Sequence, residues 1–409
     1  MTGTAVEIVL TGEELVTGKL TDSNGRYLAG KLAALGLPCG RVTMVGDDPA
    51  AITRTIADAL KRSHLVITSG GLGPTGDDLT RAAVAEATGR PLQAPPEGGG
   101  KPAYPMPEGG VPIHNPKGSA AGLWITLPEG RCLAALPGVP WEFEGMWPDL
   151  GKHVQTAFPE AVRHGITLRT AGLMEREVER RASAALADIP GCGVGVTANP
   201  LLVDLHLHAA DPSTLARATQ AVRDALGDVI YTTGDASLAQ VVGDTLRERG
   251  LKLATAESCS GGAICAALVR EPGASDYVEG AIVSYANTAK KTLLGVPEHM
   301  LETQGAVSEP VARAMAEGLL TRTQADIALA VTGIAGPGGG TPEKPVGMVF
   351  MAIADRAATF CRAFHHPGDR ERVILRTVHR GIDLIRHYLH GDIADLERRF
   401  PAESPDGKR

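Results

Sequence analysis

The chain of 409 residues has 43% apolar and 21% charged residues and a formal net charge of -7. Because a single hydrophobic core stops growing well below this length, we expect two to three globular domains and exclude a disordered chain. The acidic balance argues against nucleic-acid binding, and neither a signal-type amino terminus nor a membrane-length apolar stretch is present. The six cysteines are scattered without a CxxC pair, which favours reduced thiols and a cytoplasmic location.

The first region alternates strand-like and helix-like segments, which predicts a parallel sheet covered by helices. In sheets of this kind the binding site lies at the carboxyl ends of the strands, so the loops there hold the candidate residues. The predicted order is a strand at 5–10, a helix at 23–35, a strand at 37–45, a helix at 49–61 and a strand at 64–69.

The loop at 69–81, SGGLGPTGDDLTR, carries the most informative pattern of this region. Three of its glycines satisfy GxGxxG, but the match follows a third strand and contains a proline. Two acidic residues that would repel a pyrophosphate come next, so we reject a dinucleotide fingerprint. The adjacent Asp77 and Asp78 instead favour a divalent metal ion held between them and the phosphates of a ligand. The simpler alternative, a cap on the helix that follows, explains Asp78 alone.

The segments between the two candidate sites carry no catalytic constellation. Residues 92–114 are so dense in proline and glycine that they exclude a helix and predict a mobile surface loop or lid. Residues 166–233 follow β-α-β-β-α-β order, which is typical of a small α+β domain.

Residues 253–262, LATAESCSGG, predict a second site in a region where the strand-helix alternation resumes. Ser258 stands on a turn between a buried strand and a helix, beside helix-start N–H groups that can cradle a phosphate or an oxyanion. We therefore interpret Ser258 as a nucleophile and its neighbour Cys259 as a packing residue. The alternative, in which Ser258 or Ser260 only caps the helix, is favoured for this short pattern taken alone.

Further loops at strand ends support the nucleophile hypothesis. A lysine whose pKa is lowered by burial can accept the proton of a serine, and Lys290 begins a helix close to the end of a strand at Tyr285. The glycine-rich run at 333–340 offers backbone N–H groups, and Arg370 offers a charged fork for a phosphate. A surface lysine that merely starts a helix remains the alternative for Lys290. Together the pieces predict an amide-cleaving site for a phosphorylated substrate.

The motifs of the first region resemble the molybdopterin-binding-like domain of the competence/damage-inducible protein A (CinA) family. The matching motifs are GEELVTGKLTDSN at 12–24, GGLGPTGDDLTR at 70–81, NPKGSAAG at 115–122 and LPGVPWEF at 136–143. The resemblance implies metal-dependent hydrolysis of ADP-ribose to AMP and ribose 5-phosphate. It places Asp77, Asp78, Glu14 and Asp22 at the metal ion, Thr80 beside metal and phosphate, and Asn24, Gly70, Gly71, Gly73, Asn115, Gly118 and Ser119 around the substrate. Glu13 stands where the family usually has threonine, and 92–114 is shorter than the family's helical insertion.

The later motifs resemble the nicotinamide-nucleotide amidase domain of the same family. They are TAESCSGG, YANTAKKTLLGV, GAVSEPVA, VTGIAGPGGGTPEKPVG and the GDR segment. The resemblance implies conversion of nicotinamide mononucleotide (NMN) to nicotinate mononucleotide and ammonia, through an acyl-enzyme and without a cofactor. It assigns Ser258 as nucleophile and Lys290 as base, with supporting and binding positions at Tyr285, Ser275, Gly261, Gly262, Thr332, Gly333 and Arg370. Ala286 replaces a serine that is usual in the second motif.

We therefore predict an α/β protein in which two α/β layer domains are joined by a small α+β domain. The expected bounds are 1–160 for the pyrophosphatase domain, 161–235 for the connecting domain, 236–393 for the amidase domain and 394–409 for a tail. The expected function is bifunctional salvage of pyridine nucleotides by a cytoplasmic homodimer that binds NMN and ADP-ribose, with no nucleic-acid or membrane partner. Two alternatives stay open: a first domain that only binds a pterin or nucleotide, and a non-catalytic competence adaptor.

Overall fold

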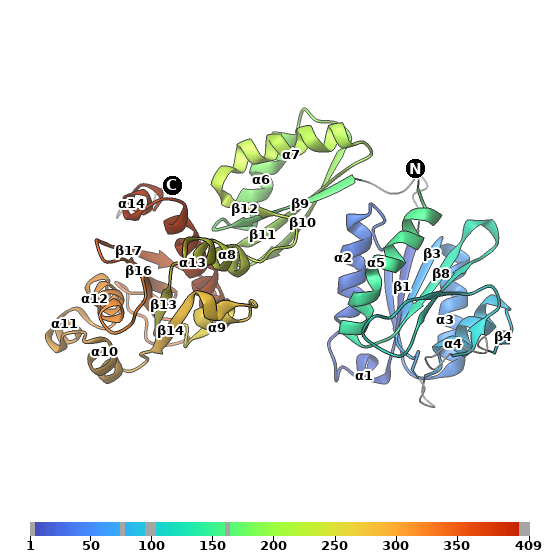
Figure 1. Ribbon diagram of the computed structural model, residues 1–409, viewed down its shortest axis with the longest axis horizontal. Helices are drawn as coiled ribbons and strands as arrows, with labels where there is room; N and C mark the ends of the chain where they lie inside the picture. The colour runs from blue at the N-terminus through green and yellow to red at the C-terminus, as the bar shows by residue number, and fades with distance from the viewer. Residues whose placement is uncertain (1–4, 74–77, 95–103, 160–163, 401–409) are drawn as a thin grey trace. The chain divides into compact units, whose positions relative to one another are not determined.

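The computed structural model describes residues 5–73, 78–94, 104–159 and 164–400 (Figure 1). The chain divides into two compact units: residues 1–165 form most of the first, and most of residues 166–409 form the second. Each unit is described by itself below.

The first unit contains a six-stranded sheet in the order β2-β1-β3-β8-β7-β6. Its parallel strands are β1 (Val6–Thr11), β2 (Arg41–Val45), β3 (Leu65–Ser69) and β8 (Cys132–Leu136), and its antiparallel strands are β7 (Gly122–Thr126) and β6 (Val111–Ile113). Figure 1 shows α2 (Asn24–Ala34) and α5 (Pro140–Ala157) on one face, and α3 (Pro49–Arg62) and α4 (Thr80–Thr88) on the other. The predicted layered α/β arrangement is confirmed.

The alternation of side chains along the strands explains the two helical layers. Ile8 and Leu10 of β1 join the apolar cluster that contains Leu28 of α2 and Phe143 of α5, whereas Val9 joins the cluster beneath α3 and α4. Successive side chains of a strand point to opposite faces, so a strand that is apolar throughout must be covered on both sides. Because these strands run parallel, their carboxyl ends meet at one edge of the sheet. Helix α1 (Glu13–Val16) and the loop after β3 lie at this edge.

The prediction that residues 92–114 form only a surface loop is wrong for its described parts. Strands β4 (Leu92–Gln93) and β5 (Met106–Pro107) pair with each other, and β6 joins the main sheet as its edge strand. Ile113 is fully buried, and Pro112 stands on an edge strand, where its missing N–H costs no ladder bond. The proline content that argued against a helix was compatible with an edge strand. Residues 95–103 lie outside the described ranges.

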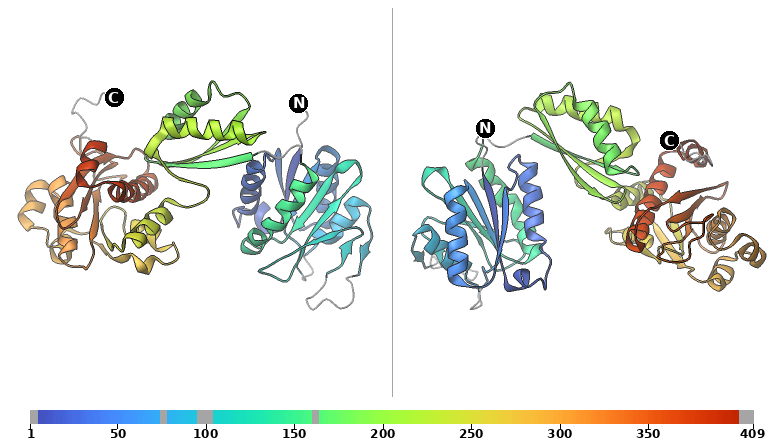
Figure 2. Two further views of the ribbon diagram at one scale, coloured as in Figure 1. Left: turned by 45° about the horizontal axis from the view of Figure 1, so that its top comes forward. Right: turned by 180° about the vertical axis from the view of Figure 1, so that it is seen from behind.

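The second unit begins with a four-stranded sheet in the order β10-β11-β9-β12. The elements are β9 (His164–Ala171), α6 (Glu175–Leu186), β10 (Cys192–Asn199), β11 (Leu202–Ala209), α7 (Pro212–Leu226) and β12 (Ile230–Thr233). The predicted β-α-β-β-α-β order is therefore confirmed, and Figure 2 shows both helices on one face of this sheet.

A five-stranded sheet follows in the order β14-β13-β15-β16-β17. Strands β13 (Leu253–Glu257), β14 (Val278–Val283) and β15 (Ile327–Gly333) are parallel, and β16 (Met348–Ala354) and β17 (Thr359–His365) are antiparallel. One face packs on α8 (Leu238–Arg249), α9 (Ala263–Val269) and α13 (Arg370–His390); the other packs on α10 (Asn287–Leu294), α11 (Glu298–Gln304) and α12 (Glu309–Leu320). This is the second predicted α/β layer domain.

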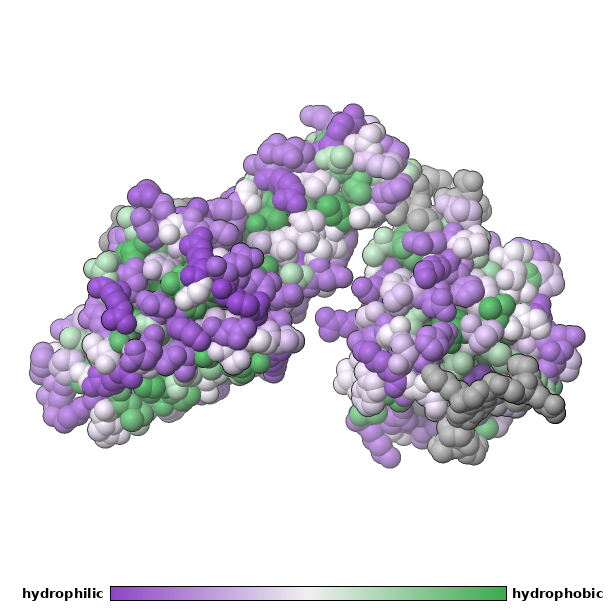
Figure 3. Space-filling model, viewed as in Figure 1, coloured by the Kyte–Doolittle hydropathy of each residue, from purple (hydrophilic) through white to green (hydrophobic). Residues whose placement is uncertain are grey.

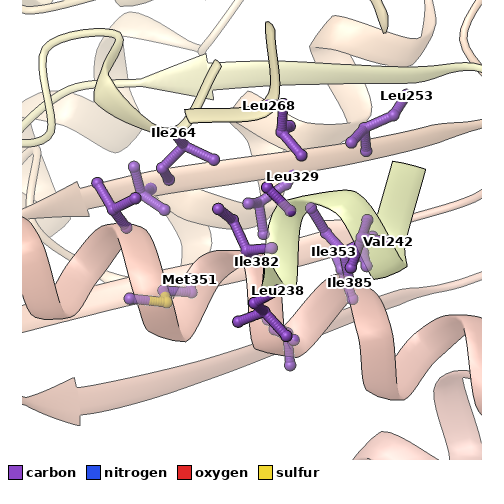
Figure 4. Close-up of a cluster of buried hydrophobic side chains, with 14 of the residues drawn as sticks. Leu238, Val242, Leu253, Ile264, Leu268, Leu329, Met351, Ile353, Ile382 and Ile385 are labelled. Atoms are coloured by element: carbon purple, nitrogen blue, oxygen red, sulfur yellow. The ribbon is translucent and has the colours of Figure 1, made fainter. Parts of the chain in front are cut away.

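Side-chain size differs between the two faces of this sheet. Large side chains such as Leu253, Leu329 and Ile353 meet those of α8, α9 and α13, as Figure 4 shows. The opposite face is lined by alanines of β13, β15 and β16, so α12 packs closely against the strands. Alternation of large and small apolar residues thus fixes which helices cover which face.

The predicted tail at 394–409 begins inside a helix, α14 (Ile393–Arg399), which packs on β17 and α13 and buries Leu396 in the core. Figure 3 shows hydrophilic side chains over much of the visible surface. Within the described ranges, no helix combines the length and the apolar character that a membrane crossing requires.

Candidate active site

The strand β13 delivers Ser258 to the carboxyl edge of the five-stranded sheet. Ser258 is 8% exposed, and its N–H donates to the carbonyl of Val331 on the neighbouring strand at 3.0 Å. Gly261 and Gly262 have φ values of 64° and 96°, a region that glycine enters without steric cost. The predicted glycines therefore shape a tight turn that holds the serine hydroxyl at the strand end.

Lys290 of α10 meets Ser258 from the adjacent strand-helix connection. Its Nζ lies 3.0 Å from Ser258 Oγ, 2.7 Å from the carbonyl oxygen of Ser284 and 3.3 Å from that of Tyr285. Lys290 is only 1% exposed, and this burial lowers the pKa of its amine below the usual value. A neutral amine has two N–H groups and one lone pair; two carbonyls can take the N–H groups, which leaves the lone pair for the serine hydroxyl.

Glu257, the last residue of β13, was not among the predicted site residues. Its Oε2 accepts hydrogen bonds from the N–H groups of Gly262 and Ile264, both at 3.0 Å, and its Oε1 from that of Cys265 at 2.8 Å. The prediction that unpaired N–H groups at the start of α9 cradle a substrate is therefore wrong, since Glu257 occupies them. A charged residue at the end of an otherwise apolar strand was the available sequence signal.

Thr332 and Gly333 end β15 at the same edge as Ser258. The Thr332 hydroxyl donates to the carbonyl of Ala306 at 2.8 Å, and a Cβ on Gly333 would lie 3.0 Å from Cys259 Sγ. These contacts hold the edge together, and the roles of Thr332 and Gly333 toward a ligand stay predictions. Burial raises the pKa of the Cys259 thiol to about 12, which agrees with its assignment as a packing residue.

Arg370 and Tyr285 link three loops above this edge. Arg370 donates to the carbonyl of Gly336 at 2.9 Å and to the Tyr285 hydroxyl oxygen at 3.1 Å. Both side chains are exposed, Tyr285 by 62%. The structure thus brings the predicted positions Arg370 and Tyr285 together, within reach of a ligand that approaches from solvent.

Ser275 does not belong to this edge, and its prediction as a supporting residue is wrong. It lies in the 3-10 turn η3 (Ala274–Asp276), directly before β14 begins, and its carbonyl accepts from Lys252 Nζ at 3.4 Å. Ser284, by contrast, follows the carboxyl end of the same strand, and its carbonyl oxygen accepts from Lys290 Nζ. Because β13 and β14 are parallel, Ser275 stands at the opposite end of the strands, about 20 Å away for a six-residue strand.

The first unit has a cleft of about 110 Å³ at the carboxyl ends of its parallel strands. Of the predicted residues, Glu14, Asp22 and Asn24 line it. Asp22 accepts from the N–H of Gly25 at 2.9 Å, and Asn24 donates to the Ser69 hydroxyl at 3.0 Å and to the carbonyl of Gly138 at 2.7 Å. These polar groups fix the first turn of α2 against the ends of β3 and β8.

Of the four carboxylates that the family resemblance places at a metal ion, Glu14, Asp22 and Asp78 lie in the described ranges, and the metal site stays a prediction. Asp78 accepts from the N–H of Gly73 at 2.7 Å, which closes its own loop, and Thr80 is fully buried beside Thr11. In the described ranges, no group of three or more His, Cys, Asp or Glu residues is arranged to hold a metal ion. Asp77 lies outside these ranges.

The remaining predicted residues of the first unit also have local contacts. Gly70 and Gly71 approach β1 and α4 so closely that a Cβ would lie 2.3 Å from the carbonyl oxygen of Thr11 and 2.5 Å from Thr80 Oγ1. The side chain of Asn115 accepts from the N–H groups of residues 117 and 118 and donates to Glu142, another residue that was not predicted. A Cβ on Gly118 would strike the Glu142 carboxylate, and Ser119 is exposed.

Two family matches cover most of the chain. Residues 235–389 match the CinA C-terminal domain, and residues 7–156 match the probable molybdopterin binding domain. A putative competence-damage inducible protein of Symbiobacterium thermophilum is 38% identical, covering 94% of this chain and 99% of its own length. A CinA-like protein of Salinibacter ruber is 39% identical over 89% of this chain and 94% of its own. The solved competence/damage inducible protein CihA of Agrobacterium tumefaciens is 40% identical, with coverage of 38% of this chain and 94% of its own and a TM-score of 0.37.

Proposed function

The chain belongs to the CinA family, and we propose that its carboxyl-terminal domain is a serine amidase that hydrolyses NMN to nicotinate mononucleotide and ammonia. The observation that carries the proposal is the 3.0 Å contact between Lys290 Nζ and Ser258 Oγ, at a strand end where burial lowers the pKa of the lysine. A serine hydroxyl is a weak nucleophile until a neighbouring base accepts its proton.

The contacts of Lys290 support the following sequence of proton transfers. As Ser258 Oγ attacks the carboxamide carbon, its proton moves to Lys290 Nζ, and the tetrahedral adduct forms. Lys290 then protonates the departing nitrogen, so ammonia leaves and an acyl ester remains on Ser258. Water attacks this ester while Lys290 again accepts a proton; Lys290 then returns the proton to Ser258 Oγ as the ester bond breaks, and nicotinate mononucleotide is released. The lysine returns to its neutral form after each half of the cycle.

We assign the oxyanion of the tetrahedral adduct to the N–H groups of Cys259 and Ser260. In the part of the chain that the structure describes, these two amides of the turn donate to no protein oxygen and have the weakly accepting Cys259 sulfur beside them, whereas those of Ser258, Gly261 and Gly262 all donate to oxygens. The residue that follows a nucleophile commonly supplies such a donor, because its N–H lies beside the attacking oxygen. The exposed guanidinium of Arg370 suits the phosphate of the substrate.

For the amino-terminal domain we propose metal-dependent hydrolysis of ADP-ribose to AMP and ribose 5-phosphate. Its support is the family match and a polar cleft at the strand ends, lined by Glu14, Asp22 and Asn24. The cleft and the match to a probable molybdopterin binding domain equally suit the alternative, a domain that only binds a pterin or a nucleotide. A competence adaptor without catalysis is the alternative for the whole chain. We also propose that the protein is a cytoplasmic homodimer.

The test is an assay of the purified full-length protein with NMN and, separately, with ADP-ribose and a divalent metal ion. We expect ammonia and nicotinate mononucleotide from NMN, with turnover lower by at least about 10³-fold in Ser258→Ala. Chelation by EDTA should stop the release of AMP from ADP-ribose and leave deamidation of NMN unchanged. NMN deamidation that survives in Ser258→Ala would contradict the serine assignment. Absence of AMP under every metal ion would favour the binding-only alternative.

A further inference from the structure

The carboxylate of Glu257 is the most heavily hydrogen-bonded acidic group beside the proposed nucleophile. Glu257 is fully buried, and it directly precedes Ser258. Besides the three backbone N–H groups of α9, two side chains donate to it. The donors are Thr255 Oγ1 at 3.1 Å, Ser260 Oγ at 2.7 Å, and the N–H groups of Gly262, Ile264 and Cys265 at 3.0, 3.0 and 2.8 Å. Five donors thus converge on one side chain.

A buried carboxylate is costly, and a helix does not need one to begin. Burial of a charge is tolerated only where hydrogen bonds or a counter-charge replace water, and short polar residues at the N-cap satisfy helix starts equally well. The N-cap of α9 is Gly262, and Glu257 reaches it across the whole turn that contains Ser258. The carboxylate therefore joins the strand before the turn, the turn itself and the helix after it.

We infer that Glu257 is a positioning residue for the amidase reaction: its carboxylate fixes the turn 258–262 so that Ser258 Oγ stays in contact with Lys290 Nζ. Thr255 anchors it on β13 and Ser260 inside the turn, while the N–H groups of α9 close the far side. The inference rests on the proposed function of Ser258. It also implies that the start of α9 is not a phosphate site, since its amides are already taken.

The two oxygens of Glu257 are not equivalent, and this makes Glu257→Gln an informative variant. An amide NH₂ in place of Oε2 would face the backbone N–H groups of Gly262 and Ile264, which can only donate. If the amide NH₂ instead replaces Oε1, it faces the N–H of Cys265 and the hydroxyl of Thr255. The Thr255 hydroxyl can rotate and accept a hydrogen bond from the NH₂. Glutamine should therefore fold with its NH₂ toward Thr255, with the contact to Cys265 lost and the turn loosened.

The experiment compares steady-state kinetics with NMN and the melting temperature for wild type, Glu257→Gln, Ser260→Ala and Asp392→Ala. Asp392 caps α14 with its carboxylate, so its alanine variant is a matched loss of a helix cap. Misplacement of a reacting group by about 1 Å can cost about 10²-fold in rate, so we expect kcat to fall between about 10-fold and 10²-fold in Glu257→Gln. KM should stay within about 3-fold, because Glu257 is buried away from the substrate. Asp392→Ala should melt earlier and keep its kcat.

A kcat of Glu257→Gln within about 3-fold of wild type, once corrected for folded protein, overturns the inference. If that variant does not fold, Ser260→Ala decides: we expect kcat to fall about 3-fold to 10-fold with KM unchanged, and an unchanged kcat overturns the inference. Labelling of Ser258 by a fluorophosphonate, followed by intact mass, is a second readout that needs no NMN. Slow labelling in Glu257→Gln supports positioning even if NMN is not the substrate, so the two hypotheses fail separately.

Discussion

The turns after β3 and after β13 contain the same kinds of residues but differ in the side chains that contact them. Both follow a buried parallel strand, both contain glycines at positive φ, and both hold a carboxylate that accepts backbone N–H groups. In the turn after β13, a second element supplies Lys290, which is buried and contacts the serine hydroxyl. In the loop after β3, the carboxylate of Asp78 accepts from the N–H of Gly73 in its own loop.

This difference shows what a glycine-rich strand-helix turn can and cannot specify. The local sequence determines the turn, because glycine permits the backbone conformation and the acidic side chain satisfies free N–H groups. The chemistry depends on a partner from a neighbouring strand end, and only the turn after β13 has one with a lowered pKa among the described residues.

The largest effect should come from Lys290→Arg. A guanidinium keeps the charge but does not give up its proton near neutral pH, so we expect kcat for NMN to fall by at least about 10²-fold with a nearly unchanged Kd for NMN. Lys291→Arg is the matched control, because Lys291 is exposed and pairs with Glu298. Substantial turnover in Lys290→Arg would mean that Lys290 only binds the phosphate of the substrate and is not the base. The turn after β13 would then no longer differ from the turn after β3 by having a catalytic base.

The next prediction concerns Asp78 and asks whether the front loop is catalytic. We expect Asp78→Ala to lower ADP-ribose hydrolysis at least about 10-fold while NMN deamidation stays within about 2-fold. Asp78→Asn separates two roles, since asparagine can still accept from the Gly73 N–H but carries no charge for a metal ion. Full hydrolysis in the asparagine variant would make Asp78 a loop cap alone.

The lowered pKa of Lys290 should also appear in the pH dependence of stability. In the folded protein the amine gives up its proton at lower pH than in the unfolded chain, so between those two pKa values the unfolded state binds more protons. The free energy of unfolding should therefore rise with pH through this window, which ends near the usual lysine value of about 10.5. The slope due to one group is at most about 1.4 kcal/mol per pH unit.

Chemical denaturation of wild type and Lys290→Met at a series of pH values measures this term. Methionine has no titrating group, so the difference in unfolding free energy should shift in favour of wild type as the pH increases. NMN turnover of the wild type should rise through the lower end of the same window, where the base becomes neutral. A stability difference that does not change with pH would mean that Lys290 titrates at its ordinary pKa.

The sequence predicted the layered sheets and several residues of the candidate site, but not all of them. Hydrophobic alternation predicted both layered sheets, and Ser258, Lys290, Tyr285 and Arg370 were predicted and lie at one edge. The role of Glu257 could not be predicted, since its contacts depend on where α9 begins after the turn. Ser275 was assigned from the family resemblance alone; it precedes β14 in the sequence, which already places it at the amino end of that strand.

The smallest effect should come from Cys259→Ala, and it tests the choice of nucleophile. The thiol is 6% exposed and lies against Gly333, and burial raises its pKa to about 12, so the reactive thiolate is scarce at neutral pH. We expect kcat within about 3-fold of wild type and a loss of about 1 kcal/mol in unfolding free energy from the small cavity. A loss comparable to that of Ser258→Ala would mean that sulfur attacks the substrate. Unchanged kinetics would instead leave Ser258 as the nucleophile and Cys259 as the contact that seats the turn on β15.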